Sequence, residues 1–249
     1  KWQNSEIEGI DIMLAIDVST SMLAEDLKPN RLEAAKDVAA EFINGRPNDN
    51  IGITLFAGET FTQCPLTVDH AVLLDMIHNI KCGLITDGTA VGMGIANAVT
   101  RLKDSKAKSK VIILLTDGTN NKGDISPMTA AEIAKSFGIR VYTIGVGTNG
   151  MAPYPYPVGN TVQYVSMPVE IDEKTLTEIA GTTDGNYFRA TSNSKLKEVY
   201  EEIDKLEKTK LNVKEYSKRD EEYHWFALAA FLCVLLEVLL RNSVLKKIP

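Results

Sequence analysis

The sequence has few of the residues from which zinc and redox sites are built. Its 249 residues include three cysteines and three histidines, and no C-x-x-C pair occurs. A zinc site is therefore not expected. Cys64 and Cys82 could pair in an oxidising compartment, but we expect two buried free thiols, and Cys233 lies in an apolar run.

A strong charge of either sign is also absent. Lys and Arg number 27 against 33 Asp and Glu, and the net charge of −6 excludes an extended basic surface for nucleic acid. With 44% hydrophobic and 24% charged residues, the composition fits one globular domain plus an appendage. The chain begins at Lys1 with polar residues and without a visible signal peptide, so we expect a processed start and a short lead-in over residues 1–9.

A long apolar run lies near the carboxyl end of the sequence. Residues 225–240 read WFALAAFLCVLLEVLL, and Arg241, Lys246 and Lys247 follow. The run is slightly shorter than the ~20 residues of a usual spanning helix, and Glu237 is a costly charge inside it. Aromatic residues at one end and basic residues at the other suit the two interfaces of a bilayer.

We therefore predict a transmembrane helix over residues 223–241, after a linker at 209–222 and before a basic cytoplasmic tail at 242–249. The positive-inside tendency places the large domain on the other side of the cell membrane, in the periplasm or outside. The alternative is an apolar helix that docks on protein or dimerises.

Strand and helix patterns alternate through the first two hundred residues. Near-continuous apolar runs such as Ile10–Ile16 are typical of strands buried on both faces of a parallel sheet. The alternation predicts an α/β fold, a doubly wound, mostly parallel sheet flanked by helices in a Rossmann-like arrangement. The other predicted strands are 51–56, a short one near Phe61, 110–116, 139–146 and an edge strand near Tyr187; the predicted helices are 31–43 after the N-cap Asn30, 69–80, 90–102, 127–137, 173–180 and 194–208. The last helix is strongly charged, which indicates a solvated face rather than a docking surface.

The alternation fails between Gly147 and Glu170. This segment holds four of the nine prolines and three tyrosines, so we expect an inserted loop. It leaves a strand at the edge of the sheet where ligands bind, which makes it a candidate specificity loop; a rigid spacer that covers apolar surface is an equally good interpretation. As a specificity loop it would contact a partner through Met151, Tyr154, Tyr156 and Tyr164.

Oxygen-bearing side chains gather at the predicted carboxyl ends of two strands. Asp17 follows the first strand and opens D-V-S-T-S with Ser19 and Ser21, Asp117 follows V-I-I-L-L-T, and Thr89 lies in D-G-T-A before a helix. Ligands of doubly wound proteins bind at this edge of the sheet. A set made only of oxygen donors suits Mg²⁺, or Mn²⁺ or Ca²⁺. Asp87 fits a turn residue better than a ligand.

These motifs, in this order, resemble the metal-ion-dependent adhesion site of von Willebrand factor A domains. The resemblance covers residues 10–208 and implies that Ser19, Ser21 and Thr89 bind the metal directly, whereas Asp17 and Asp117 act through water. It also implies a partner protein that presents an Asp or Glu to the metal.

A narrower resemblance is to the BatA-type membrane proteins of the bacterial aerotolerance family. Segments such as DIMLAIDVSTSMLAEDLKPNRLEAAK, LFAGETFTQCPLT and RVYTIGVGTNGMAPYPYP carry it. That family implies a role in envelope integrity or oxygen and stress tolerance, with other aerotolerance membrane proteins and a MoxR-type ATPase as partners. Its members also have membrane segments before the A domain, which this chain does not show.

Enzymatic motifs are weak. Gly145–Gly150 formally matches G-x-G-x-x-G, but three prolines follow where a helix would have to begin. Asp17 resembles the nucleophile of haloacid-dehalogenase phosphatases, yet Ser19 stands where their second acid is needed. We therefore expect a protein-binding module and not an enzyme; the alternatives are an Mg²⁺-dependent phosphoryl-transfer enzyme and an A domain whose metal site is not functional and which acts as a scaffold.

Overall fold

The computed structural model describes residues 9–148, 150–159 and 161–216, together with the single positions 228, 230, 231, 234 and 237. The chain divides into two compact units, Lys1–Glu207 and Lys208–Pro249. The first unit contains every strand found in the described residues. No helix among the described residues is long and apolar enough to cross a membrane. The predicted transmembrane helix lies almost wholly outside the described residues, and the lead-in does so except for Gly9.

A six-stranded sheet in the order β3-β2-β1-β4-β5-β8 forms the centre of the first unit. All neighbouring strands are parallel except β3, which pairs antiparallel with β2. The prediction of a mostly parallel, doubly wound sheet is therefore confirmed. The strands are β1 (Asp11–Asp17), β2 (Asn50–Phe56), β3 (Thr60–Thr67), β4 (Lys110–Thr116), β5 (Ile139–Val146) and β8 (Tyr187–Ala190).

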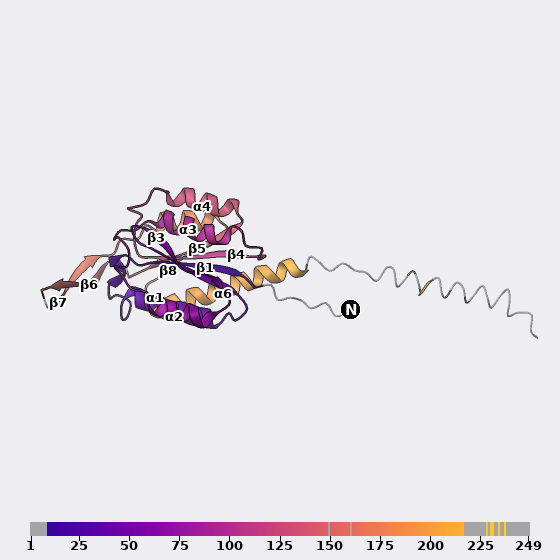
Figure 1. Cartoon of the computed structure of the whole chain (residues 1–249), viewed down its shortest axis with the longest axis horizontal. Helices are drawn as coiled ribbons and strands as arrows, with labels where there is room; N and C mark the ends of the chain where they lie inside the picture. Colours follow the sequence, from indigo (N-terminus) through magenta and orange to yellow (C-terminus); the bar gives the residue numbers. More distant parts are fainter. Residues whose placement is uncertain are drawn as a thin grey trace, which may run out of the picture. The chain divides into compact units, whose positions relative to one another are not determined.

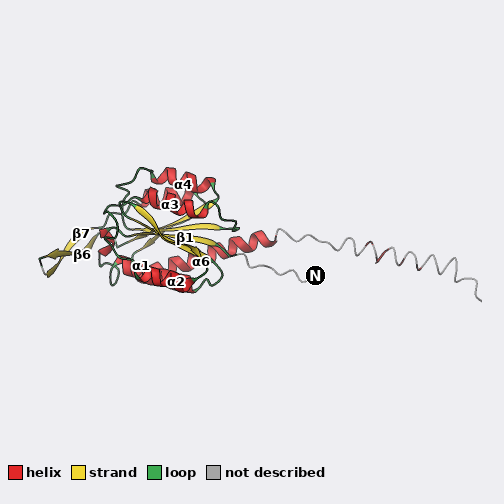
Figure 2. Cartoon of the chain, in the orientation of Figure 1, coloured by secondary structure: helices red, strands yellow, loops and turns green. Residues whose placement is uncertain are grey.

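Helices cover both faces of this sheet (Figures 1 and 2). One face packs on α3 (Val91–Leu102), α4 (Pro127–Ser136) and α5 (Glu173–Thr182), whose apolar residues share one core with alternate residues of β1, β4 and β5. The other face packs on α1 (Arg31–Asn44), α2 (His70–His78) and α6 (Asn193–Tyr216). A short 3₁₀ helix, η1 (Thr20–Leu23), follows β1. Residues 209–216, which the sequence assigns to a linker, are helical.

The first turn of α1 is fixed by the predicted cap. The Asn30 side chain accepts a hydrogen bond of 2.8 Å from the Glu33 amide, which satisfies one of the free donors at the helix start. Arg31 is thereby the first helical residue, close to the loop that leaves β1.

The proline-rich insertion is not a loop, as the sequence suggested, but an antiparallel hairpin of β6 (Met151–Val158) and β7 (Thr161–Pro168). The hairpin forms its own two-stranded sheet and projects from the layers (Figure 1). Prolines are compatible with β6 because Pro153 and Pro155 occupy alternate positions, whose backbone groups face away from β7. The Pro153 carbonyl accordingly accepts from the Glu25 amide at 2.8 Å instead of from β7.

The charged helix α6 is not only a solvated face. Glu207 is buried at 1% exposure, where it accepts hydrogen bonds from Ser109 Oγ at 2.8 Å, Arg140 Nε at 2.9 Å and Tyr142 Oη at 2.6 Å. Burial alone would raise the pKa of Glu207, but the hydrogen bonds from Arg140 and Tyr142 and the charge of Arg140 hold that pKa below its usual value. This network ties α6 to the ends of β4 and β5 opposite the predicted metal site.

Replacing Glu207 with Gln is expected to lower the free energy of unfolding by about 2 kcal/mol, because the hydrogen bonds from Arg140 and Tyr142 would lose their charged acceptor. Urea unfolding followed by circular dichroism measures this change. Glu202→Gln, at an exposed position of the same helix, is the matched control and should change stability by less than about 0.5 kcal/mol. Equal stability of the two variants would contradict a structural role for Glu207.

Candidate metal centre

Two carboxylates lie side by side at the carboxyl edge of the sheet. Asp17 is the last residue of β1 and Asp117 follows the last residue of β4, and these strands are hydrogen-bonded neighbours. Both side chains are buried, Asp17 at 0% exposure and Asp117 at 2%. The sheet topology therefore places two like charges together inside the protein.

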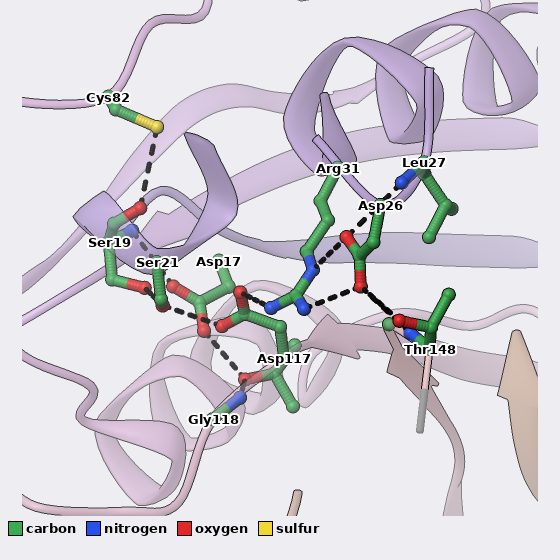
Figure 3. Close-up of polar contacts among 12 residues, drawn as sticks. Asp17, Ser19, Ser21, Asp26, Leu27, Arg31, Cys82, Asp117, Gly118 and Thr148 are labelled. Carbon is green, nitrogen blue, oxygen red and sulfur yellow. Dashed lines mark hydrogen bonds and ion pairs between the residues drawn. The ribbon is translucent and has the colours of Figure 1, made fainter. Parts of the chain in front are cut away.

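Hydroxyl groups connect the two acids (Figure 3). Asp17 accepts from the Ser19 amide at 2.9 Å and from Thr116 Oγ1 at 2.6 Å. Ser19 Oγ and Ser21 Oγ lie 3.0 Å apart, and Ser21 Oγ donates to Asp117 Oδ1 at 2.7 Å. The predicted residues Asp17, Ser19, Ser21 and Asp117 thus form one cluster of oxygen atoms.

Thr89 approaches this cluster from the loop before α3. Its amide donates to Asn121 Oδ1 at 2.9 Å, and its carbonyl accepts from the Asn121 amide at 3.0 Å. A Cβ atom added to Gly118 would lie 3.3 Å from Thr89 Oγ1, so the Thr89 hydroxyl lies against the residue that follows Asp117. The structure therefore brings all five predicted site residues to one edge.

Asp87 supports the serine loop from outside the cluster. Its carboxylate accepts from the Thr20 amide at 3.0 Å and from Thr20 Oγ1 at 2.8 Å. Burial raises the pKa of Asp87, but the two hydrogen bonds from Thr20 outweigh it and lower the pKa overall. Thr20 lies between Ser19 and Ser21, so Asp87 positions the loop that carries the two serines.

The electrostatics of the cluster favour a bound cation. Burial, and after it the charge of Asp117, raise the pKa of Asp17 to about 7. The pKa of Asp117 is raised as well, by its burial. Such shifts mean that the carboxylates lack sufficient positive charge nearby, which a divalent cation would supply.

The donor types indicate which cation fits. Among the described residues there is no group of three or more His, Cys, Asp or Glu that could hold a metal ion, so a site here depends on hydroxyl oxygens. Oxygen donors with two carboxylates suit Mg²⁺, Mn²⁺ or Ca²⁺. The residues present therefore fit the kind of ion that the sequence predicts.

Arg31 and Asp26 complete the cluster, and sequence analysis missed both. Arg31, 4% exposed, donates from Nη1 to Asp117 Oδ2 at 2.6 Å and from Nε and Nη2 to the two Asp26 oxygens at 2.7 Å each. Burial works against an ionised Asp26, but the hydrogen bonds from Arg31 and Thr148 lower its pKa to about 2. The available sequence signal was an arginine on the apolar face of α1, one residue after the cap.

The four predicted partner contacts all lie on the hairpin, but not together. Met151, Tyr156 and Tyr164 are exposed at 58%, 58% and 60%, whereas Tyr154 is partly buried. The register of the hairpin places Met151 and Tyr164 on one side of the ribbon and Tyr154 and Tyr156 on the other. The hairpin root is joined to the cluster, because Thr148 donates to Asp26 Oδ2 from its amide at 2.8 Å and from its hydroxyl at 3.1 Å.

Neither Cys64 nor Cys82, the two cysteines among the described residues, contributes a ligand. Cys64 and Cys82 are both free, as predicted, although Cys82 is only partly buried. The Cys82 thiol donates to the Ser19 carbonyl at 3.4 Å, and burial together with the nearby Asp17 charge raises its pKa to about 12. It remains a neutral thiol at physiological pH.

Comparison with known proteins agrees with this architecture. The family model of the von Willebrand factor type A domain matches residues 11–202. The chain belongs to this family. An uncharacterized protein of Borreliella burgdorferi is 28% identical to the chain over 242 residues, which cover 96% of this chain and 71% of that protein.

Relatives of the A domain include longer proteins. A UPF0353 protein of Mycolicibacterium paratuberculosis is 33% identical over 205 residues, covering 76% of this chain and 58% of that protein. The chain therefore spans little more than half the length of such relatives.

Two solved structures resemble the A domain at 34% identity. One is the conserved hypothetical protein BatB from Bacteroides thetaiotaomicron, with a TM-score of 0.70, 80% of this chain covered and 100% of that chain. The other is an aerotolerance-related membrane protein from Bacteroides fragilis, with a TM-score of 0.68, 79% of this chain covered and 100% of that chain. The resemblance to the aerotolerance family is thereby confirmed.

The raised pKa of Asp17 predicts how the metal-free A domain responds to pH. Because the folded-state pKa of about 7 exceeds the ordinary aspartate pKa of 3.8, the native state binds more protons than the unfolded state between these values, and stability falls as pH rises through this window. In EDTA, the melting temperature should therefore be higher at pH 5 than at pH 8 in wild type. Asp17→Asn, which keeps the shape of the side chain, should weaken this dependence; an unchanged profile would exclude Asp17 as its source.

Proposed function

We propose that this chain is a divalent-metal-dependent protein-binding module, held in a membrane by its carboxyl-terminal apolar segment. The observation that carries the proposal is the cluster of three hydroxyls and two buried carboxylates at the carboxyl edge of the sheet. In the proposed role the module belongs to an envelope complex for oxygen or stress tolerance.

The proposed metal ligands are Ser19, Ser21 and Thr89 directly, with Asp17 and Asp117 acting through water. Hydroxyl ligands carry no charge, and carboxylates held at a water's distance neutralise the ion only in part. The ion, Mg²⁺ or alternatively Mn²⁺ or Ca²⁺, would then keep its affinity for a further anionic ligand. An Asp or Glu of the partner protein supplies that ligand.

The contacts of Asp17 argue against the enzymatic alternative. A phosphoryl-transfer nucleophile needs an accessible oxygen, but Asp17 is fully buried and each of its oxygens accepts a hydrogen bond, from Ser19 and from Thr116. Both carboxylate oxygens of Asp87 likewise accept hydrogen bonds, from the amide and the hydroxyl of Thr20. In the proposed site the waters between the metal and Asp17 or Asp117 already engage these two acids, so none of the three acids is left as a free general base, which supports a binding role without catalysis.

Membrane location and partners rest on the family and the sequence. The resemblance to an aerotolerance-related membrane protein supports a membrane role for the predicted segment 223–241. We place the A domain outside the cytoplasm and residues 242–249 inside. Other aerotolerance membrane proteins and a MoxR-type ATPase are the proposed partners, and Met151, Tyr154, Tyr156 and Tyr164 are proposed to add specificity beside the metal.

Metal binding is tested by thermal unfolding. Millimolar Mg²⁺ or Mn²⁺ should raise the melting temperature of wild type, because a ligand of the native state stabilises it by mass action. Asp17→Ala should abolish the shift. Equal shifts in both proteins would refute this metal site, and no shift in wild type would favour the scaffold alternative.

Partner binding is tested with a pair of substitutions at Thr89. Thr89→Ala removes one proposed ligand and should reduce Mg²⁺-dependent capture of membrane proteins by about tenfold, whereas Thr89→Ser keeps a hydroxyl and should retain most of it. Quantitative mass spectrometry of material captured with and without EDTA measures the effect. Capture at full strength in EDTA would point to a metal-free interface, and metal-dependent phosphoester turnover lost in Asp17→Ala would point to an enzyme.

Membrane anchoring is tested by truncation. A chain that ends at Lys218 lacks the apolar run and should move from the membrane fraction to the soluble fraction on sedimentation. In intact spheroplasts, protease added from outside should digest the A domain of the full chain. Sedimentation of the shortened chain with membranes, or protection of the domain from protease, would contradict the proposed topology.

A further inference from the structure

The outer edge of β6, the one away from β7, cannot pair with another strand, and we call it closed. Val169 N–H donates to the Gly150 carbonyl at 2.8 Å, so backbone groups in phase with Gly150 face the partner strand. Pro153 and Pro155 have the opposite phase and face outward, and the Pro153 carbonyl is already taken by the Glu25 amide. Proline has no N–H to offer at these outward positions, so β6 cannot accept another strand there.

The register of the hairpin also shows that the outer edge of β7, the one away from β6, is free to pair with another strand. Residues directly opposite one another in an antiparallel pair both face inward or both face outward. Ser166 lies opposite Pro153, and Tyr164 lies opposite Pro155. The N–H and C=O groups of Val162, Tyr164 and Ser166 therefore face outward, and among the described residues none of them has a backbone hydrogen-bond partner.

The hairpin also lacks the usual protection of a free edge. Edge strands are normally shielded by lysines, prolines or bulges, but residues 151–168 contain no charged residue, and β7 reaches Pro168 before its first proline. All eight residues of β7 are exposed, among them Val162, Tyr164, Val165 and Met167. A two-stranded ribbon with such surfaces is only marginally stable in water, and additional strands would stabilise it.

We propose that β7 pairs with β7 of a second copy of this chain, antiparallel and centred on Tyr164. Two hairpins would then form one continuous sheet whose outer edges are the closed edges of β6. In this register Tyr164 lies opposite itself and Val162 lies opposite Ser166, as the two-fold symmetry of an isologous interface requires.

A second copy matches this edge, because its own β7 presents the same unpaired N–H and C=O groups and the pairing closes both open edges at once. The net charge of −6 on each chain opposes association, but residues 151–168 carry no charge, so no like charges of the two hairpins meet. The hairpin also projects from the layers of the domain, where a second hairpin can reach it (Figure 1). The pairing goes beyond the proposed metal-dependent function and does not require the metal.

Proline substitution at the open edge tests the pairing. Self-association of the full chain in mild detergent with EDTA is measured by sedimentation velocity over a range of concentrations. Ser166→Pro removes an outward N–H and should raise the dimer dissociation constant by about tenfold or more, since the symmetric interface loses this donor twice. Ser166→Ala keeps the N–H and should stay within about twofold of wild type.

The two variants share the apolar segment, so any association through that segment cancels in the comparison. Equal dissociation constants for Ser166→Pro and Ser166→Ala would overturn the proposal, as would a wild-type chain that is monomeric at every concentration. Melting temperatures of both variants, with and without Mg²⁺, show that the A domain and its metal response are intact.

Disulfide trapping tests the register independently of stability. Hydrogen-bonded partners in an antiparallel pair have Cα atoms ~5.5 Å apart, within the range that a disulfide spans. Tyr164→Cys should therefore form a covalent dimer under mild oxidation. Thr161→Cys lies opposite Met167 of the other copy, far from its own counterpart, and should not exceed the wild-type background. Cross-linking of both variants to the same extent, or of neither, would exclude this pairing.

Discussion

The structure at the carboxyl edge of the sheet depends on the burial of two like charges. Asp17 and Asp117 lie at the carboxyl ends of neighbouring parallel strands, and the strand register prevents them from moving apart. In a low-dielectric environment two unscreened carboxylates are unfavourable, and each must be hydrogen-bonded, protonated or paired with positive charge. The hydroxyls of Ser21 and Thr116 and the guanidinium of Arg31 meet part of this requirement.

Arg31 links this requirement to more distant parts of the domain. It divides its donors between Asp117 and Asp26, and Asp26 in turn binds the hairpin root at Thr148. One positive charge therefore serves two buried acids, which leaves room for a divalent ion without an excess of positive charge. The same contacts fix the start of α1, the serine loop and the hairpin root relative to one another, so that a surface for a partner can be built around the ion.

The fold and the positions of Asp17, Ser19, Ser21 and Asp117 were predictable because they follow local rules. Apolar runs identify the buried strands, and polar residues directly after them must lie at the carboxyl edge of a parallel sheet. The pairing of Arg31 with Asp117 joins residues 86 positions apart, and neither residue alone distinguishes a buried partner from a solvated one. The burial of Glu207 was missed for a similar reason, since its partners Ser109, Arg140 and Tyr142 lie 98, 67 and 65 positions away in the sequence.

The hairpin was missed because its prolines were counted as strand breakers, whereas their phase decides their effect. Placed on every second residue, Pro153 and Pro155 direct their missing donors to the same side of β6, away from the ladder with β7. This arrangement constrains how the segment can change in length. With the turn unchanged, an insertion or deletion of a single residue between the prolines and the turn would direct the prolines toward β7 and break the ladder, whereas a change of two residues would preserve their phase. In related chains that keep the prolines and the turn, this part of β6 should therefore lengthen or shorten in steps of two residues.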